Sequence, residues 1–201
     1  MESDNITPED RALLKRLLKK ECDYPVPENI LDRLIDMGRM KTYDKWDNII
    51  SEGDINPDVY IAMEGILRCF YWDGDREKTA FFSTLPTLFM SYHSYFRDEP
   101  SFYTFQACTP ARILHIKRED FDRLLTASHD FAMWNLRLCQ TQQYYFELKQ
   151  KHNTGEAIDK YKSLVRELPN IMQEVPLQTV ASYLGITPQY LSKLRKQMIG
   201  R

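Results

Sequence analysis

The sequence predicts an α+β fold: N-terminal helices, an antiparallel β-roll of the jelly-roll type, a long helix and a C-terminal helix-turn-helix. Three observations support this. Hydrophobic residues recur at helical spacing near both ends, they form short β-branched and aromatic runs between residues 40 and 116, and two helical segments flank a glycine within 177–196. We therefore expect a roll domain at 1–127, the long helix and a hinge at 128–153, and a helix-turn-helix domain at 154–201.

The stretch 177–196 is the most specific pattern in the chain. Ala181 and Leu184 lie on one helical face of its first segment, and leucines recur three residues apart in its second. Gly185 between the segments can adopt the left-handed conformation that closes a helix, and Thr187 offers an N-cap hydroxyl followed by proline at the first helical position. This order is typical of a helix-turn-helix, and an ordinary helical hairpin is the alternative.

The outward face of the second segment carries side chains suited to base edges and phosphates. Between residues 177 and 201 there are four basic residues and no acidic one, although the whole chain has a formal net charge of -2. A locally basic end on a mildly acidic protein is the charge distribution expected of a DNA-binding tip. The candidate DNA-contacting residues are Thr187, Gln189, Tyr190, Ser192, Lys193 and Lys196.

Composition limits the remaining possibilities. The chain has 201 residues, 43% hydrophobic and 28% charged, so it can bury a core in one large or two small domains. No apolar run approaches the roughly 20 residues that span a bilayer, and the acidic, polar N-terminus is unlike a secretory signal peptide. A cytoplasmic location without membrane contact is expected. The four cysteines lie far apart without a Cys-x-x-Cys pair, so neither a metal site nor a cofactor is expected.

The four histidines do not indicate an enzyme. None has an Asp, Ser or Cys partner at the spacing of a catalytic motif, and no glycine-rich phosphate loop occurs. Isolated histidines are more often surface or packed residues, and His115, inside a strand-like run, is expected to be structural. No catalytic residue is therefore assigned.

The first 116 residues change from helical to strand periodicity. Thr7 followed by proline and two acids predicts a helix start, and a second helix is expected from Glu28 to Met37, ended by Gly38. The turn signals that follow include Asp73-Gly74, which predicts a hairpin. The predicted strands are the runs 49–50, 60–63, 66–72, 79–82, 103–106 and 113–116.

Part of this strand region carries a family resemblance. Glu52-Gly53-Asp54, followed by the run Val59 to Arg68 with Gly65, resembles the early strands of the cyclic-nucleotide-binding β-roll. With the long helix and the C-terminal motif, nearly the whole chain resembles the Crp/Fnr family of bacterial transcription regulators. The resemblance implies a homodimeric transcription factor that binds double-stranded DNA at an inverted-repeat operator. It also implies a small-molecule effector of unknown identity and contact with RNA polymerase as a further partner.

The chain departs from the family pattern where a cyclic nucleotide would bind. The resemblance implies a Phe-Gly-Glu whose Glu holds the ribose hydroxyl, and an Arg-Ser or Arg-Thr whose Arg holds the phosphate. Here Phe89-Met90-Ser91 and Ser101-Phe102 stand at those positions, so cyclic AMP is not expected to bind. The seven aromatic residues between 89 and 105 either fill a collapsed pocket or line a pocket for a more apolar ligand. The candidate effector residues are Phe89, Ser91, Tyr92, Arg97, Ser101, Phe102 and Tyr103.

A long helix is predicted from about His129 to Lys151. Its hydrophobic residues alternate three and four apart, which is typical of a coiled-coil seam, although packing against the chain's own roll could explain half of them. In the resembled family this helix forms the dimer. The candidate interface is Phe131, Trp134, Leu138, Thr141, Tyr145 and Leu148, and the candidate hinge is Asn153-Thr154-Gly155.

The remaining expectations concern the C-terminal domain. A helix from Tyr161 to Ile171 should precede the motif, and little or no β-hairpin wing is expected because the chain stops five residues after Lys196. In the alternative interpretation, the roll is a regulatory or scaffolding module whose helical tail binds protein rather than DNA. The basic, acid-free tail favours the DNA-binding regulator.

Overall fold

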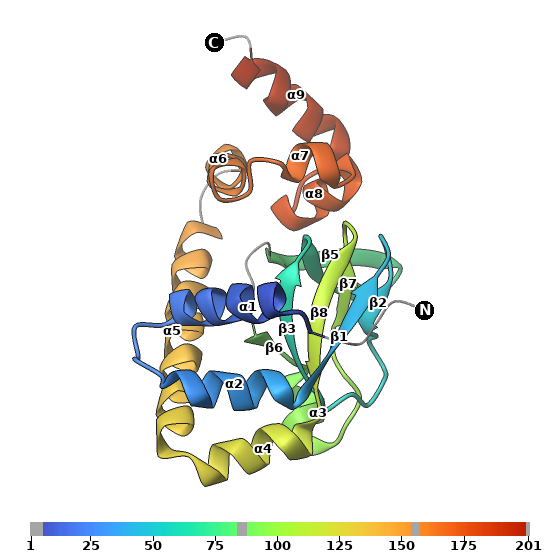
Figure 1. Cartoon of the computed structure of the whole chain (residues 1–201). Helices are drawn as coiled ribbons and strands as arrows, with labels where there is room; N and C mark the ends of the chain where they lie inside the picture. The colour runs from blue at the N-terminus through green and yellow to red at the C-terminus, as the bar shows by residue number, and fades with distance from the viewer. Residues whose placement is uncertain (1–5, 84–87, 154–156, 200–201) are drawn as a thin grey trace.

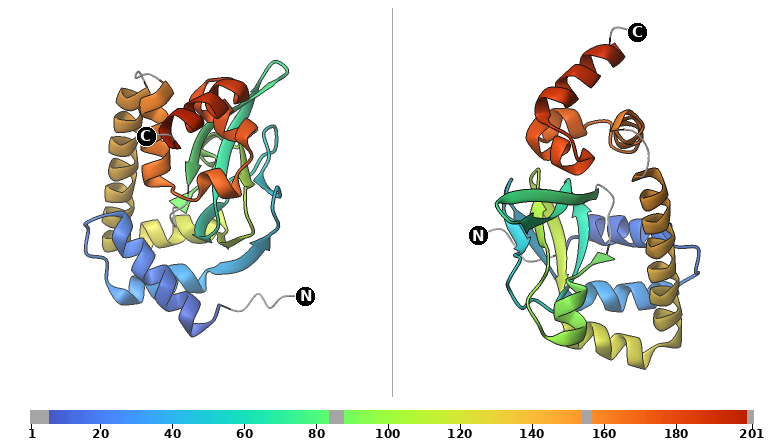
Figure 2. Two further views of the ribbon diagram at one scale, coloured as in Figure 1. Left: turned by 90° about the horizontal axis from the view of Figure 1, so that it is seen from above. Right: turned by 180° about the vertical axis from the view of Figure 1, so that it is seen from behind.

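The computed structural model describes residues 6–83, 88–153 and 157–199 (Figure 1). A β-roll occupies the centre, helices cover one of its sides, and a helical domain formed by residues 157–199 lies beyond one end of the roll, as the views in Figure 2 also show. We call this last part the C-terminal domain. The predicted α+β architecture of helices around an antiparallel roll is confirmed.

Short-range signals determine where the first helices begin and end. The hydroxyl of Thr7 accepts the N–H of Asp10, whose carboxylate accepts the N–H of Thr7, and this capping box starts α1. Helix α2 ends at Asp36 because the chain then enters the sheet at Gly38. The helices before the C-terminal domain are α1 Pro8–Glu21, α2 Glu28–Asp36, α3 Tyr92–Arg97, α4 Arg118–Ala127 and α5 His129–Asn153.

Two antiparallel sheets of four strands form the roll, with orders β1-β8-β3-β6 and β2-β7-β4-β5. All six predicted strand runs are confirmed, and the Asp73-Gly74 turn joins β4 to β5 as expected. The strands are β1 Gly38–Tyr43, β2 Asn48–Ile50, β3 Val59–Glu64, β4 Leu67–Asp73, β5 Arg76–Ser83, β6 Leu88–Phe89, β7 Thr104–Ala107 and β8 Ala111–Ile116.

The C-terminal domain contains α6 Ala157–Glu167, α7 Ile171–Glu174, α8 Leu177–Leu184 and α9 Pro188–Ile199. The helix expected at 161–171 instead ends at Glu167, since Pro169 cannot continue it, and α7 forms a separate turn. Of the expected hinge, Asn153 ends α5, while Thr154 and Gly155 lie outside the described residues. None of the described helices is long and apolar enough to cross a membrane.

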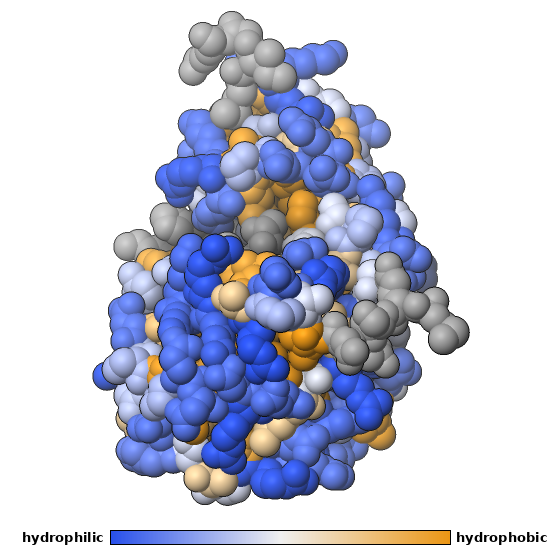
Figure 3. All heavy atoms as spheres, viewed as in Figure 1, coloured by the Kyte–Doolittle hydropathy of each residue, from blue (hydrophilic) through white to orange (hydrophobic). Residues whose placement is uncertain are grey.

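Three hydrophobic clusters hold these parts together. The first lies between the β1-β8-β3-β6 sheet and helices α1, α2, α4 and α5, and the second lies between the two sheets. The third joins Phe82 and Cys108 of the roll to the core of the C-terminal domain. In Figure 3, hydrophilic side chains cover most of the face formed by α1 and α2, and hydrophobic ones show beneath the C-terminal domain. The roll and the C-terminal domain are therefore packed against each other.

Candidate functional site

The turn between α8 and α9 is fixed by backbone geometry. Gly185 has φ 68° and ψ 30°, the left-handed conformation predicted for it, and its N–H bonds to carbonyls of the last turn of α8. The N–H of Ile186 reaches the carbonyl of Ala181 at 3.0 Å. There is open space where a side chain on Gly185 would lie, so the positive φ rather than crowding favours glycine here.

Helix α9 begins at a side-chain cap. The hydroxyl of Thr187 accepts the N–H of Tyr190 at 3.2 Å, and the carbonyl of Thr187 accepts the N–H of Leu191 at 3.0 Å. The Thr187 hydroxyl, one of the candidate DNA contacts, is therefore already hydrogen-bonded as the N-cap. This bond defines where the first turn of α9 begins.

The two faces of α9 differ sharply in exposure. Leu191 and Leu194 are 0% and 3% exposed and pack into the C-terminal domain, whereas Tyr190 is 47% exposed. Gln189, Lys193 and Lys196 are also exposed, and Ser192 is half-buried. The structure thus places most of the predicted DNA-contacting side chains on one outward surface, at the end of the molecule farthest from α4 (Figure 1).

The charges on this surface are unpaired within the part of the chain that the structure describes. None of the ion pairs found there involves Lys193, Arg195 or Lys196. By contrast, Lys15 and Arg11 on α1 pair with Asp32 on α2. The cations of α9 are consequently free to attract an external anion.

Aromatic rings fill the interior of the roll. Phe89 is 7% exposed and stacks between Tyr60 and Phe105, with ring centroids 5.4 Å and 5.1 Å apart. The ring of Phe81 meets Phe105 edge-on at 6.1 Å. Of the candidate effector residues, Phe89 is therefore part of the core between the sheets.

The two serines at the expected ligand positions are hydrogen-bonded to backbone groups two or three residues away. Ser91 is 5% exposed, and its hydroxyl accepts the N–H of Ser94 at 3.4 Å, which caps α3. Ser101 is 3% exposed, and its hydroxyl donates to the carbonyl of Tyr103 at 2.8 Å. Both hydroxyls serve local turns, so neither is directed at a ligand.

The other candidate effector residues lie on the surface of α3 and the following loop. Tyr92, Phe102 and Tyr103 are 49%, 59% and 41% exposed, and Arg97 is exposed as well. The structure therefore does not bring the seven candidates together around one cavity. Two shallow hollows lie elsewhere, beside the N-terminus of α1 and between the α1–α2 loop and α5.

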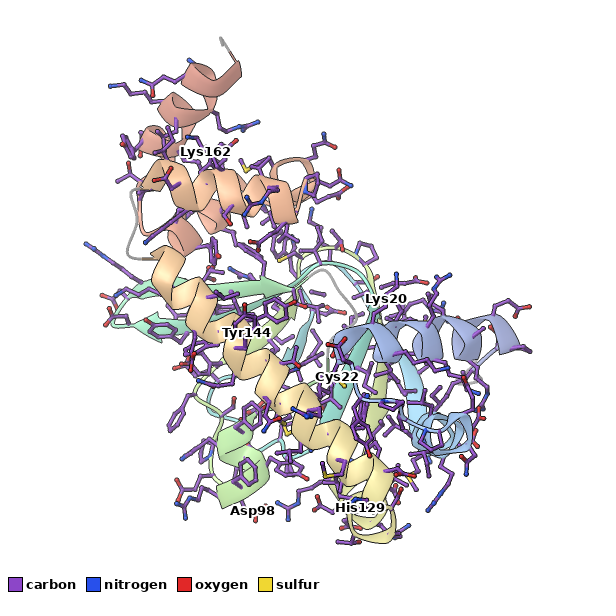
Figure 4. All side chains as sticks on the ribbon, turned by 90° about the vertical axis from the view of Figure 1, so that its left-hand side faces the viewer. Lys20, Cys22, Asp98, His129, Tyr144 and Lys162 are labelled. Atoms are coloured by element: carbon purple, nitrogen blue, oxygen red, sulfur yellow. The ribbon has the colours of Figure 1, made fainter. Side chains whose placement is uncertain are left out.

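The predicted dimer seam divides between two environments. Phe131, Trp134 and Leu138 are 0%, 0% and 1% exposed and belong to the first hydrophobic cluster of their own chain. The Sγ of Cys22 lies 3.8 Å from the carbonyl of Trp134, and Figure 4 shows Cys22 beside α5. These three residues cannot contact a second chain in this arrangement, which corrects their assignment to an interface.

The other half of the seam is accessible. Thr141 and Leu148 are half-buried, and Tyr145 is 58% exposed. The exposed face of α5 contains a different set at coiled-coil spacing, which we call the outer stripe: Leu136, Cys139, Gln143 and Phe146. Sequence periodicity did not separate the two faces, because the inward residues follow the same three-and-four spacing.

His115 has a structural role, as its position in a strand indicates. Its ring stacks on Tyr60 at 4.9 Å, and its Nε2 lies 2.7 Å from a carboxylate oxygen of Asp58. Burial raises the pKa of Asp58, but hydrogen bonds from Lys117, His115 and the N–H of Arg118 outweigh it, so this pKa lies below its ordinary value. Burial lowers the pKa of His115, and Asp58 offsets this only in part. The pair anchors β3 to the start of α4.

Metal ligands do not gather in the described residues, where no group of three or more His, Cys, Asp and Glu side chains could hold an ion. The free cysteines at 22, 69 and 108 are buried, and Cys139 is exposed.

Comparisons with known proteins agree with this geometry. Residues 40–128 match the family model of the cyclic nucleotide-binding domain. No curated protein matches the chain by sequence.

Similar solved structures extend the match to most of the chain. The c-di-GMP-responsive global regulator CLP of Xanthomonas campestris is 14% identical with a TM-score of 0.68, covering 87% of this chain and 92% of that one. FixK2 of Bradyrhizobium japonicum is 14% identical with a TM-score of 0.64, covering 81% and 85%. The catabolite activator protein of Thermus thermophilus is 16% identical with a TM-score of 0.53, covering 86% and 83%.

These matches first define a class, since the central part of the chain is a cyclic nucleotide-binding domain. The long helix and the C-terminal domain follow this domain in an arrangement similar to that of the three solved structures. Their identity to this chain is 14–16%, so the likeness shows a shared fold, and it is a fold of the kind that the family resemblance in the sequence implies.

Proposed function

We propose that the protein is a sequence-specific, DNA-binding transcription regulator in which α8 and α9 form the helix-turn-helix and α9 enters the major groove. The observation that carries the proposal is the outer surface of α9, where exposed polar and cationic side chains have no acidic partner among the described residues. The architecture it shares with CLP, a global regulator, supports the same assignment.

The individual roles follow from position on α9. Gln189 and Lys193 lie one turn apart and are exposed, so both reach base edges when the helix lies in the groove. Glutamine can make paired hydrogen bonds to adenine, which is sequence-specific. Lys196 lies about one turn beyond Lys193, near the end of α9. It is suited to contact the DNA phosphate backbone, where it adds affinity without specificity.

Substitutions on α9 test these roles. Gln189→Ala should weaken binding to the cognate site by about 1–3 kcal/mol and relax sequence preference. Lys196→Ala should weaken binding to all sequences alike and reduce the salt dependence by about one phosphate contact. Fluorescence anisotropy with a site selected from random DNA, titrated at several salt concentrations, gives both quantities.

The matched control is Lys162→Ala, which removes an exposed lysine of α6 in the same domain (Figure 4). Binding should be unchanged in this variant. If Gln189→Ala lost the same affinity for specific and for random DNA, Gln189 would not be a base-contacting residue. Binding of a protein partner without any DNA affinity would instead favour the scaffolding function.

We further propose that the protein is a homodimer paired through the outer stripe of α5. Leu136 is 48% exposed and Phe146 is 56% exposed, and a stripe of this spacing, apolar except for Gln143, on a long helix is suited to pairing with a second copy. Parallel pairing brings two α9 helices to one side. The operator is then an inverted repeat whose half-site centres lie about 34 Å apart, one turn of DNA.

The roll, in this proposal, does not bind cyclic AMP. Burying a cyclic phosphate requires a cation and hydrogen-bond donors that replace its water, and the loss is several kcal/mol without them. Ser101 and Ser91 stand where the arginine and glutamate of the family would be, and both hydroxyls are already bonded to neighbouring backbone groups. The stacked ring of Phe89 further supports a filled interior.

A further inference from the structure

A serine of α8 is hydrogen-bonded to the edge of a roll sheet. The hydroxyl of Ser182 donates to the carbonyl of Glu77 at 2.8 Å and accepts the N–H of Thr79 at 3.0 Å. Both groups belong to β5, the last strand of the β2-β7-β4-β5 sheet. An edge strand has unpaired backbone groups that normally require another strand or water. One side chain of the C-terminal domain here satisfies a donor and an acceptor of that edge at once.

The edge that Ser182 contacts is held rigidly from inside the sheet. Arg68 on β4 is 6% exposed, and its Nη2 donates to a carboxylate oxygen of Glu77 at 3.0 Å. The Nε of Arg68 donates to Gln106 on β7 at 2.8 Å, and the guanidinium lies 4.1 Å from the ring centroid of Phe70. Three neighbouring strands therefore fix the position of Glu77, and Ser182 connects α8 to this network.

Apolar contacts surround the hydrogen bonds but cannot orient the domain alone. The rings of Phe82 and Tyr183 meet at 5.3 Å, and Thr79 is 5% exposed beneath α8. Lys45 adds one bond, from its Nζ to the carbonyl of Glu174 at 3.1 Å. Hydrophobic attraction is non-directional, so packed surfaces can slide. Paired hydrogen bonds with fixed geometry define which rotation of α8 is stable.

The docked arrangement leaves the outer surface of α9 uncovered. Figures 1 and 2 show α9 running away from the roll, while α8 faces it. Tyr190 is accordingly 47% exposed although the domain is docked. The contact between α8 and β5 therefore presents α9 rather than blocking it.

We propose that Ser182 is a positioning residue for DNA reading: it fixes the rotation of α8 on β5 and so sets the direction in which α9 meets the groove. The proposal rests on the DNA-binding function proposed above. In a dimer, two α9 helices held at fixed angles select the spacing between half-sites. Binding to a single half-site does not depend on that angle, because the whole molecule can turn to fit one half-site.

The test uses the full-length protein and the variants Ser182→Ala, Ser182→Thr and Ser163→Ala. Alanine at 182 removes both bonds, threonine keeps the hydroxyl, and Ser163 is a control on α6 whose hydroxyl bonds within its own helix to Glu167. Hydrogen exchange of the Thr79 amide reports the contact directly. Binding is measured on an inverted repeat of optimal spacing, the same repeat with two base pairs inserted, and a single half-site.

For Ser182→Ala we expect the Thr79 amide to exchange about tenfold faster and affinity for the optimally spaced repeat to fall about tenfold. Affinity for the single half-site should stay within about twofold, so the preference for correct spacing shrinks. Ser182→Thr and Ser163→Ala should behave as wild type. Unchanged spacing preference despite faster exchange, or equal loss on repeat and half-site, would overturn the positioning role. Wild-type protein without specific DNA binding would instead overturn the proposed function, and the positioning role with it.

Discussion

The outer surface of α9 and the interior of the roll differ in where their polar groups find partners. On α9, Lys193 and Lys196 are exposed and unpaired within the described residues. In the roll, Ser91 and Ser101 are buried, and their hydroxyls are already bonded to neighbouring backbone groups. Side chains that the fold has already satisfied have little left to offer a ligand, whereas unsatisfied ones do. The comparison supports the two proposals made above, that the outer surface of α9 reads DNA and that the interior of the roll does not bind a cyclic nucleotide.

Helix α5 repeats the same contrast over two residues. Trp134 is fully buried in its own chain, and Leu136 is 48% exposed. The inward residue should therefore contribute to folding, and the outward one to association.

The largest expected effect is on folding. Trp134→Ala should lower the free energy of unfolding by about 3–5 kcal/mol, because it removes a fully buried ring that stacks on Phe131 at 5.5 Å. Denaturant titration followed by circular dichroism measures this. Leu136→Ala is the matched control and should change stability by less than about 1 kcal/mol. If both variants lost a similar free energy of unfolding, the buried and exposed faces of α5 would not differ in their contribution to folding.

The next effect is on association. Leu136→Glu places a charge in the middle of the proposed outer stripe, so light scattering should report the mass of one chain while the circular dichroism spectrum stays that of the folded protein. Operator affinity should fall with the dimer. If the variant remained dimeric, the dimer interface would have to lie elsewhere than at Leu136.

A smaller effect concerns acid stability. Asp58→Asn should cost about 1–3 kcal/mol at pH 7, because the carboxylate accepts hydrogen bonds from His115, Lys117 and the N–H of Arg118. The pKa of Asp58 is lower in the folded chain than unfolded, so its contribution is complete above the unfolded pKa and is lost as pH falls through the folded one. The gap between the variant and wild type should begin to narrow below about pH 4 and close only below the lowered folded pKa, as urea titrations across pH would show. A gap that persists in acid would assign the loss to packing.

The last prediction is that cyclic nucleotides do not change the thermal stability of the protein. A ligand at about 100 times its dissociation constant stabilises a fold by about 2.7 kcal/mol, a shift of a few degrees in Tm for a chain of this size. Cyclic AMP and cyclic GMP at millimolar concentration should leave Tm unchanged. A clear rise that Arg97→Ala abolishes would show that the exposed guanidinium turns inward and that the pocket still opens.

Sequence reasoning succeeded where a short stretch determines the structure. Gly185 and the start of α9 could be predicted because a left-handed turn and an N-cap depend on adjacent residues. Strand β1 was missed since its residues are mostly polar and largely exposed, and β6 has only two residues. Helix α3 was missed because its aromatic composition resembles a pocket lining more than a helix. The two strands owe their structure to partners distant in sequence, β8 for β1 and β3 for β6, whereas α3 has a local cap at Ser91 that its composition concealed.

The two faces of α5 could not be separated for a different reason. Phe131, Trp134 and Leu138 have coiled-coil spacing, but periodicity shows only that a face is buried, not against which chain. The contact of Ser182 with β5 joins residues more than 100 positions apart, and neither partner belongs to a recognisable motif. Such contacts depend on how domains dock, which local patterns do not encode.

The shared hydrophobic cluster makes melting a cooperative event. Phe82 and Cys108 of the roll lie in the same cluster as Leu184 and Leu191 of the C-terminal domain. Separating the two parts would expose apolar surface on both, so neither reaches its unfolded state without a free-energy cost to the other. The temperature at which α9 unfolds should therefore depend in part on the sheet against which its domain rests, so a weakened roll core should lower the melting temperature of the proposed DNA-binding helix.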